Sequence, residues 1–289
     1  MRVPLDGMAG WQDLESFEIP LSITFDDGNK IQYAKFYPSL DEHKIRATFY
    51  IITSRIGRPG KIDWDELRDL YDSDNEIGSH THTHPHLTEL SDIELDFELK
   101  KTRALLSPFK CRTLAYPFGE YDERVIDYAR RYYAAARGYY DTQHKSKDYG
   151  YNFGSTHEIY KLRVFPMDNV FPLQSIPISK FQKLVAKIIS DALQAKAWAV
   201  FVFHGPQRRT PGKIAYNLSK QLRARDTLKS IINFFDLTSF IHSREEIRKF
   251  RWMCEYLAAN DQTRILTVSE VVEYLLSHHQ LPPDVCQRG

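Results

Sequence analysis

The sequence predicts an α/β fold, a distorted (β/α) barrel of about seven parallel strands in a single domain over residues 1–289. Strand-like apolar runs alternate with helix-like segments from one end of the chain to the other, as in parallel sheets with crossover helices. Several of these runs end directly in acidic residues or histidines, and the carboxyl ends of parallel strands meet at one face of such a barrel. No internal repeat or low-complexity linker divides the chain.

Eight apolar runs are predicted to be strands. In chain order they are Pro20–Phe25, Ala47–Thr53, Asn75–Gly78, Thr113–Tyr116, Tyr132–Ala136, Tyr160–Phe165, Trp198–Phe203 and Arg264–Val268.

Three of the intervening helices begin with a capping box, in which a hydroxyl and a carboxylate three residues later satisfy backbone N–H groups. The boxes are Ser91/Glu94 before Leu95–Leu106, Ser243/Glu246 before Ile247–Ala258, and Thr267/Glu270 before Val271–Ser277. Pro108 is expected to stop the first of these helices, because proline cannot continue it.

The chain between the seventh and eighth strands is longer than a minimal barrel requires, so we expect an enlarged helical segment at about residues 205–262. It contains a hydrophobic helix around Leu228–Leu237 and a run of basic residues, which are Arg208, Arg209, Lys213, Lys220, Arg223 and Arg225. A solvated helix face is the simpler interpretation of the basic run. An anion-binding lid and a contact within a homo-oligomer are the alternatives.

The bulk composition limits the classes of partner. The formal net charge is +1, which favours neither nucleic acid nor an anionic membrane. Cys111, Cys254 and Cys286 are odd in number and widely spaced, so they predict neither a disulfide framework nor a CxxC metal site. Residues 1–18 lack the apolar stretch of a secretory signal, and no run of about 18 apolar residues predicts a membrane span. We therefore expect a cytoplasmic protein, although a signal removed beforehand would leave the same sequence and place the protein outside the cell.

Two adjacent carboxylates, Asp26 and Asp27, end the first predicted strand and are followed by Gly28. Holding two carboxylates so close is costly unless a cation or a proton separates their roles. Gly28 allows a tight turn immediately afterwards. Taken alone, the motif is equally typical of simple turn chemistry.

Four histidines alternate with other residues after the third strand, at His80, His82, His84 and His86. Pairs four residues apart, such as His80 and His84, would present two imidazoles to one metal ion on a helical turn. Four histidines within seven residues therefore predict metal binding.

Two more strands end in residues that suit a site, namely the segment Ala115–Gly119 and the run Val200–Gly205, which contains His204. A lone histidine at a strand end is more often structural than catalytic. In a parallel barrel, however, the strand ends converge on one face, where active sites are built. The residues that this argument brings together are Asp26, Asp27, His80, His84, Phe118 and His204.

On these motifs the chain resembles the polysaccharide deacetylases, the NodB-homology group of carbohydrate esterase family four, over roughly Leu21 to Leu276. The matching segments are Thr24–Gly28 (TFDDG), Ala47–Tyr50 (the second strand), His80–His84 (H-[S/T]-x-x-H), Ala115–Gly119 (most of the third motif) and Val202–His204 (the apolar run ending in histidine). The resemblance implies a hydrolase that removes N-acetyl groups from an N-acetylglucosamine-containing polysaccharide or oligosaccharide. It also implies a barrel of the NodB-homology type.

The resemblance implies a catalytic metal site formed by Asp27, His80 and His84, which leaves open positions for water and the acetyl carbonyl oxygen. Zinc suits these ligands, and cobalt or nickel are alternatives. His82 and His86 fall outside the ligand pattern and are expected to be supporting or surface residues.

The resemblance also implies roles around the reacting atoms. Asp26 would be the general base that activates the attacking water, and His204 the general acid that protonates the leaving amine. The backbone N–H of Phe118 would help to stabilise the oxyanion, with Tyr116 and Pro117 on the same substrate-facing segment.

The sequence departs from the family pattern at two places. The family's third motif often begins with an arginine that orients the base, but Ala115 stands there, and we expect Arg163 to fill this role from another strand end. The family's Asp-Trp motif near the sugar is absent, and Tyr139, Tyr140 and Asp168 are candidate replacements.

Three other functions stay open on the sequence alone. The same residues could hydrolyse O-acetyl esters of xylan-like glycans, or deacetylate a small non-polymeric amide. A carbohydrate-binding module without activity is the alternative outside the enzymes, and its signature would be loss of Asp26, of a metal ligand or of His204, all of which are present.

Overall fold

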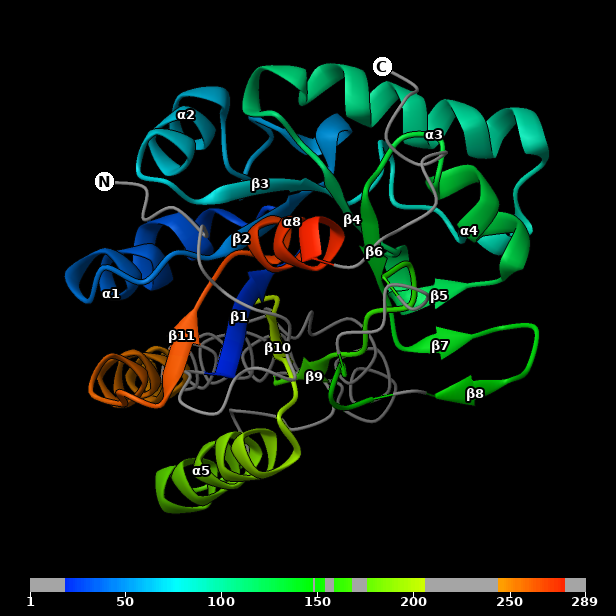
Figure 1. Cartoon of the computed structure of the whole chain (residues 1–289). Helices are drawn as coiled ribbons and strands as arrows, with labels where there is room; N and C mark the ends of the chain where they lie inside the picture. The colour runs from blue at the N-terminus through cyan, green and yellow to red at the C-terminus, as the bar shows by residue number, and fades with distance from the viewer. Residues whose placement is uncertain (1–18, 148, 154–158, 168–175, 206–243, 279–289) are drawn as a thin grey trace, which may run out of the picture.

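The computed structural model describes residues 19–147, 149–153, 159–167, 176–205 and 244–278, and its centre is one curled sheet of parallel strands (Figure 1). The strand order is β6-β4-β3-β2-β1-β10-β9, and β11 pairs with the start of β1. The strands are β1 (Ile19–Phe25), β2 (Thr48–Ile51), β3 (Glu76–Ser79), β4 (Thr113–Ala115), β6 (Ala135–Arg137), β9 (Phe165–Pro166), β10 (Ala199–Phe203) and β11 (Thr263–Ile265). All pairs between them are parallel, which confirms the predicted fold class.

A short segment at residues 159–166 contacts both β10 and the end of β6. β9 pairs with β10 in parallel, while Leu162 forms a parallel bridge with Arg137 at the end of β6. The Leu162 N–H donates to the carbonyl of Ala136 at 3.1 Å. The predicted strand Tyr160–Phe165 is therefore reduced to β9, because its residues divide their backbone pairing among Arg137, Tyr149 and β10.

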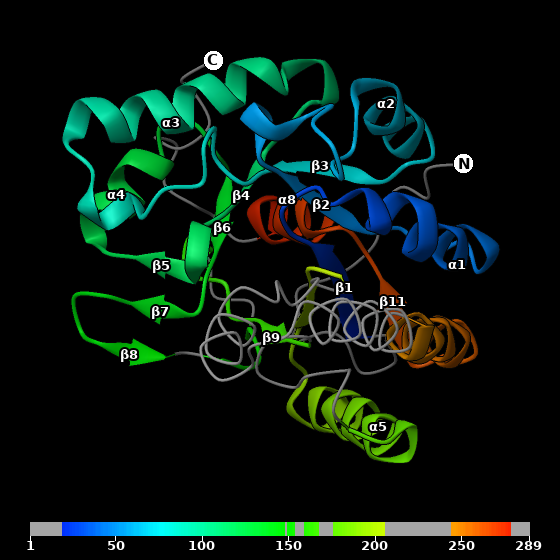
Figure 2. The ribbon, with the colours of Figure 1, turned by 180° about the vertical axis from the view of Figure 1, so that it is seen from behind.

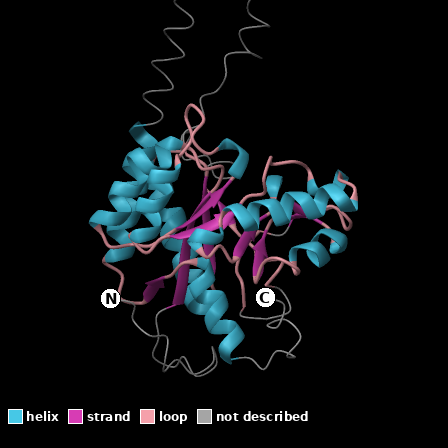
Figure 3. Ribbon diagram, turned by 90° about the horizontal axis from the view of Figure 1, so that it is seen from above, coloured by secondary structure: helices cyan, strands magenta, loops and turns pink. Residues whose placement is uncertain are grey.

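Most of the helices lie on the outside of the sheet, as Figures 1 and 3 show, while α8 covers the amino ends of the strands. The helices are α1 (Tyr37–Glu42), α2 (Trp64–Asp72), α3 (Asp92–Leu105), α4 (Glu123–Ala129), α5 (Ile178–Ala195), a helix at residues 244–258, and α8 (Val268–His278). A small sheet of β5 (Glu120–Tyr121), β7 (Tyr140–Asp141) and β8 (Ser146–Lys147) extends one side. Among the described helices, none is both long and apolar enough to cross a membrane.

Two of the three predicted capping boxes are confirmed. Ser91 and Glu94 bond each other's backbone N–H groups at the start of α3, which ends at Leu105 before Pro108. Thr267 and Glu270 do the same at the start of α8. The third box needs residue 243, which lies outside the described residues.

Aromatic side chains form much of the core between the sheet and the helices beside it. Phe25 of β1 stacks on Phe49 of β2, with ring centroids 4.9 Å apart. Phe36, Phe203 and Phe250 contact this pair or one another at centroid distances of 4.8 to 5.8 Å. All five rings are fully buried, so this cluster fixes β1, β2 and β10 against the helix at residues 244–258.

Helix α8 lies against the amino ends of the strands, at the centre of the curled sheet in Figures 1 and 2. The Val268 N–H donates to the hydroxyl of Thr48, the first residue of β2, at 3.1 Å. The Ser269 N–H donates to the carboxylate of Glu76, the first residue of β3, at 2.9 Å. The amino end of the barrel is therefore covered, and the carboxyl end is where a site can form.

The enlarged helical segment predicted at about 205–262 falls largely on residues 206–243, outside the described part of the chain. Its last part forms the helix at residues 244–258. The prediction of a single domain over 1–289 stays a prediction for the same reason.

Candidate active site

Polar side chains from three strands meet at the carboxyl end of the barrel. Asp26 follows β1, His80 follows β3 and His204 follows β10. The Asp26 Oδ2 atom lies 3.9 Å from His80 Nε2 and 3.8 Å from His204 Nε2. Asp26 and His80 are almost fully buried, while His204 is partly accessible. The convergence expected from strand ends is therefore present.

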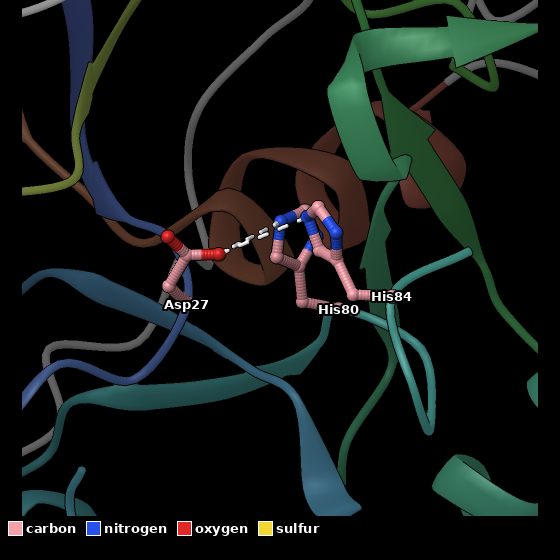
Figure 4. Close-up of side chains that lie close together, drawn as sticks. All are labelled: Asp27, His80 and His84. Atoms are coloured by element: carbon pink, nitrogen blue, oxygen red, sulfur yellow. Dashed lines mark ion pairs between the residues drawn. The ribbon is translucent and has the colours of Figure 1, made fainter. Parts of the chain in front are cut away.

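The side chains of Asp27, His80 and His84 form a group of possible metal ligands, with ligand atoms within 4.8 Å of one another (Figure 4). The Asp27 Oδ1 atom lies 3.9 Å from His80 Nε2 and 3.7 Å from His84 Nε2. Two ligands each about 2.0–2.1 Å from a tetrahedral zinc ion would lie roughly 3.3 Å apart, so small movements would complete the site. Two imidazoles and one carboxylate are the donor set of an open catalytic site rather than a closed structural one.

The two histidines are brought together by a loop and not by the helical turn that the sequence suggested. Residues 80–86 contain no helix, and the backbone is left-handed at Thr81 (φ 63°) and His84 (φ 69°). The Thr81 hydroxyl accepts the N–H of His84 at 3.1 Å, which fixes the second ligand relative to the first. Left-handed non-glycine residues are uncommon and are concentrated at functional sites. Asp27, with φ 73°, is a third such residue in this group.

Both histidines are prepared to act as neutral ligands. Burial lowers the pKa of His80, against the opposing effect of the Asp26 and Asp27 carboxylates. Burial and the neighbouring His80 lower the pKa of His84 to about 4. The His80 Nδ1 atom lies 2.8 Å from the carbonyl of Ala115, so Nδ1 carries the proton and Nε2 keeps a lone pair directed at Asp27.

The guanidinium beside Asp26 belongs to Arg137 and not to Arg163. Arg137 Nη2 donates a hydrogen bond to Asp26 Oδ1, and both side chains are buried. Burial alone would raise the pKa of Asp26, but Arg137, His80 and His204 hold that pKa below its usual value. The prediction that Arg163 orients this carboxylate is wrong. The side-chain amide of Asn152 donates to the backbone carbonyl of Arg163 and accepts the backbone N–H of Arg163.

The position of Arg137 follows from strand register. Arg137 pairs with Ala115 across β4 and β6, so the arginine missing from the third motif is supplied from the next strand at the same level. Its guanidinium lies 4.4 Å from the centroid of the Tyr50 ring, a cation–π contact. The Tyr50 ring packs directly against Gly78. A Cβ at position 78 would lie 2.5 Å from Tyr50 Cε1, so a larger residue would displace the ring.

Replacement of Arg137 by leucine is expected to lower kcat about tenfold to hundredfold, the usual cost of losing a partner that orients a site residue. It would leave Asp26 as a buried carboxylate without its cation, which also costs roughly 3–5 kcal/mol in stability. Arg163→Leu is the matched control and is expected to keep near wild-type kcat. Initial rates at a temperature where both variants are folded check the pair, and equal losses would contradict the assignment.

A buried amide ties the two strand ends that carry Asp26 and His204. Gln32 Nε2 donates to the backbone carbonyls of both residues, while Gln32 Oε1 accepts the N–H of Asn29 at 3.1 Å. Asn29 Nδ2 adds a second bond to the carbonyl of His204 at 2.9 Å. Sequence reasoning missed this tie, since an amide shortly after a turn gives no signal that it is buried.

The segment after β4 has one exposed member. Tyr116 is buried and its hydroxyl donates to the carbonyl of Tyr160 at 3.0 Å, and its place on the substrate-facing segment stays a prediction. Pro117 is also buried. Phe118 is 42% exposed with φ 57°, and its ring contacts that of His84 at a centroid distance of 4.5 Å. The Tyr139 ring lies over Gly119, where a Cβ would be 2.3 Å away.

The other two histidines of the cluster lie beside the site. His86 stacks face to face on Phe118 at 3.9 Å, and its Nδ1 atom lies 2.6 Å from Glu120 Oε2. His82 Nδ1 lies 2.9 Å from the hydroxyl of Thr53. Among the candidate sugar contacts, Tyr140 is in β7, and Asp168 lies outside the described residues.

Comparison with known proteins gives a family for the N-terminal part of the chain. Residues 17–136 match the family model of the polysaccharide deacetylases. The chitin deacetylase of Amylomyces rouxii is 31% identical over 108 residues, which are 36% of this chain and 24% of that protein. The peptidoglycan-N-acetylglucosamine deacetylase of Bacillus cereus is 25% identical over 113 residues, which are 38% of this chain and 40% of that protein. The chain thus spans less than half the length of either relative.

The fold likeness extends further than the sequence match. A family 4 acetyl xylan esterase from Clostridium thermocellum superposes with a TM-score of 0.53, covering 88% of this chain and 91% of that one at 13% identity. At this identity the likeness concerns the fold alone. His204 lies beyond the residues that match the family model, so its place in the site depends on its 3.8 Å distance from Asp26.

Proposed function

We propose that this chain, whose residues 17–136 match the family model of the polysaccharide deacetylases, is a metal-dependent hydrolase that removes N-acetyl groups from N-acetylglucosamine units of a polysaccharide or oligosaccharide. The observation that carries the proposal is the group formed by Asp27, His80 and His84 directly beside the charged carboxylate of Asp26. A binding module would need neither a metal site nor a base. The names of the two relatives, a chitin and a peptidoglycan-N-acetylglucosamine deacetylase, support the N-acetyl substrate.

Asp27, His80 and His84 would hold the metal ion. Zinc fits two imidazoles and a carboxylate, and cobalt or nickel fit the same donors. When bound, the ion would supply Lewis acidity toward the acetyl carbonyl oxygen and a positive charge for the developing oxyanion. The neutral state of both histidines, which burial favours, is the state that binding requires.

Asp26 is the base in the proposed mechanism. Arg137 keeps it ionised and fixes its orientation, so Oδ2 faces the space between His80 and His204. There it accepts a proton from the water that attacks the acetyl carbon. The Phe118 backbone N–H donates to the oxyanion, as the exposed loop position of this residue allows.

His204 is the acid that completes the reaction. Its Nε2 atom lies near the same carboxylate oxygen as His80 does, but from the carboxyl end of β10, which lies on the other side of β1 from β3. It gives a proton to the nitrogen of the sugar as the C–N bond breaks, and acetate and a free amine leave. The tie through Gln32 holds the backbone of acid and base at a fixed separation.

Acetate release from a panel of acetylated chitooligosaccharides, peptidoglycan fragments and acetylxylan tests the proposal. Each assay is run with metal-free protein, with zinc or cobalt restored, and with the Asp26→Asn variant. We expect metal-dependent release from an N-acetyl substrate, and release about 10²–10⁴-fold slower from the variant. Release from acetylxylan alone would mean that the enzyme is an O-acetyl esterase and not an amide hydrolase. No release from any glycan, with the metal tightly bound, would direct the search to a small non-polymeric amide.

A further inference from the structure

Helix α3 carries a carboxylate on its buried face. The residues of α3 that are buried are Leu95, Glu98, Leu99 and Thr102, which follow the spacing of an apolar stripe. Glu98 is only 6% exposed at a position where this pattern calls for a hydrophobic side chain. Among the described residues its carboxylate is satisfied by hydrogen bonds, which offset the cost of burying it.

The carboxylate of Glu98 is bonded entirely to the loop that carries the metal ligands. Its Oε2 atom accepts the backbone N–H groups of His82 and Thr83, both at 2.8 Å. Its Oε1 atom accepts the hydroxyl of Thr83 at 2.7 Å. One buried side chain on helix α3 thus accepts hydrogen bonds from three donor groups of two adjacent loop residues. Hydrogen bonds to a carboxylate are stronger than those between neutral groups.

The backbone N–H groups of the loop can be followed from one ligand to the other. His80 N–H donates to the carbonyl of Ile51, Thr81 N–H to the Ser79 hydroxyl, and His84 N–H to the Thr81 hydroxyl. The two N–H groups that remain, those of His82 and Thr83, are the ones that Glu98 accepts. They lie between two left-handed residues, where no helix or strand ladder offers a carbonyl.

We infer that Glu98 is a positioning residue that holds the loop between His80 and His84 in its metal-binding shape before the ion arrives. The inference rests on the proposed metal site at Asp27, His80 and His84. Without Glu98 the loop would lose the acceptor for two adjacent N–H groups and would relax toward a less strained backbone. The ligands would then have to be ordered at the expense of binding free energy, which lowers metal affinity.

Zinc affinity of purified variants, measured by competition with a chromophoric chelator, tests this role. Glu98→Leu is expected to bind zinc about 10–100-fold more weakly than wild type, as for other partners that orient ligands. Glu98→Gln should recover most of the affinity, because its amide oxygen can accept both N–H groups and its NH₂ can donate to the Thr83 hydroxyl. Asp96→Asn is the matched control on the same helix, since Asp96 bonds Tyr132 and not the loop, and its zinc affinity should equal that of wild type.

A merely structural role for Glu98 predicts a different result, in which Glu98→Leu lowers the melting temperature but binds zinc as tightly as wild type. That outcome would overturn the inference. If Glu98→Leu does not fold, hydrogen exchange of the wild-type segment 80–84 in metal-free protein decides. Slow exchange of the His82 and Thr83 amides is expected, and fast exchange would overturn the inference. Failure of the wild-type protein to bind zinc at all would instead count against the proposed metal site, and exchange would still report on the loop.

Discussion

His80→Ala is expected to abolish metal-dependent acetate release, with a loss of at least roughly 10³-fold in kcat/KM. The ion's stabilisation of transition-state charge amounts to several kcal/mol, and each 1.36 kcal/mol corresponds to about tenfold in rate. His80 is the most buried of the three ligands, and the Ala115 carbonyl fixes its tautomer, so the alanine variant loses a ligand that is held in place for the metal. Parallel measurements of bound zinc and of acetate release with the best substrate of the panel check the prediction.

The matched control is His86→Ala from the same cluster. His86 bonds Glu120 and stacks on Phe118, so its loss is expected to leave zinc affinity unchanged. Wild-type protein treated with a chelator should lose activity as His80→Ala does, and should regain it when zinc is restored. Acetate release by His80→Ala that still depends on added metal would contradict the ligand assignment.

The ligand group could be predicted from sequence because its residues belong to short motifs that directly follow predicted strands. Asp26 and Asp27 directly follow an apolar strand, and His80 and His84 follow another, so the convergence of strand ends brings them together whatever the details of the barrel. The loop shape could not be predicted, since spacing alone cannot distinguish a helical turn from a loop with left-handed residues. That shape depends on Glu98, a contact from a different element.

Arg137 was not predicted as the partner of Asp26 because the predicted fifth strand ended one residue too early. The sequence placed the fifth strand at Tyr132–Ala136, one residue short of Arg137, whereas β6 is Ala135–Arg137. With the correct end, Arg137 would have been a charged residue at a strand end and an obvious candidate to pair with Asp26. Strand ends are set by register with neighbouring strands, here Ala115 with Arg137, and register is a long-range property.

Asp26→Asn is expected to lower kcat about 10²–10⁴-fold, the range for a lost general base, while KM and zinc affinity change little. The amide has nearly the shape of the carboxylate and can still accept the hydrogen bond from Arg137, but it cannot take a proton from water. The His80 and His84 ligands keep their own contacts, so the metal should stay bound. Steady-state kinetics at saturating zinc, with bound metal measured on the same sample, check the prediction.

A double-mutant cycle shows whether Arg137 acts through Asp26. If the guanidinium serves to ionise and orient this carboxylate, Arg137→Leu should be costly in the wild-type background and nearly without effect on kcat in the Asp26→Asn background, because residues that act as a unit are strongly non-additive. Arg137→Leu should likewise lower stability less in the Asp26→Asn background than in the wild type. An asparagine at position 26 leaves no buried charge when Arg137 is removed. Two losses that simply add would mean that Arg137 contacts the substrate independently. A full wild-type rate in Asp26→Asn would move the base to another residue, and His204, 3.8 Å from Asp26, would be the next to substitute.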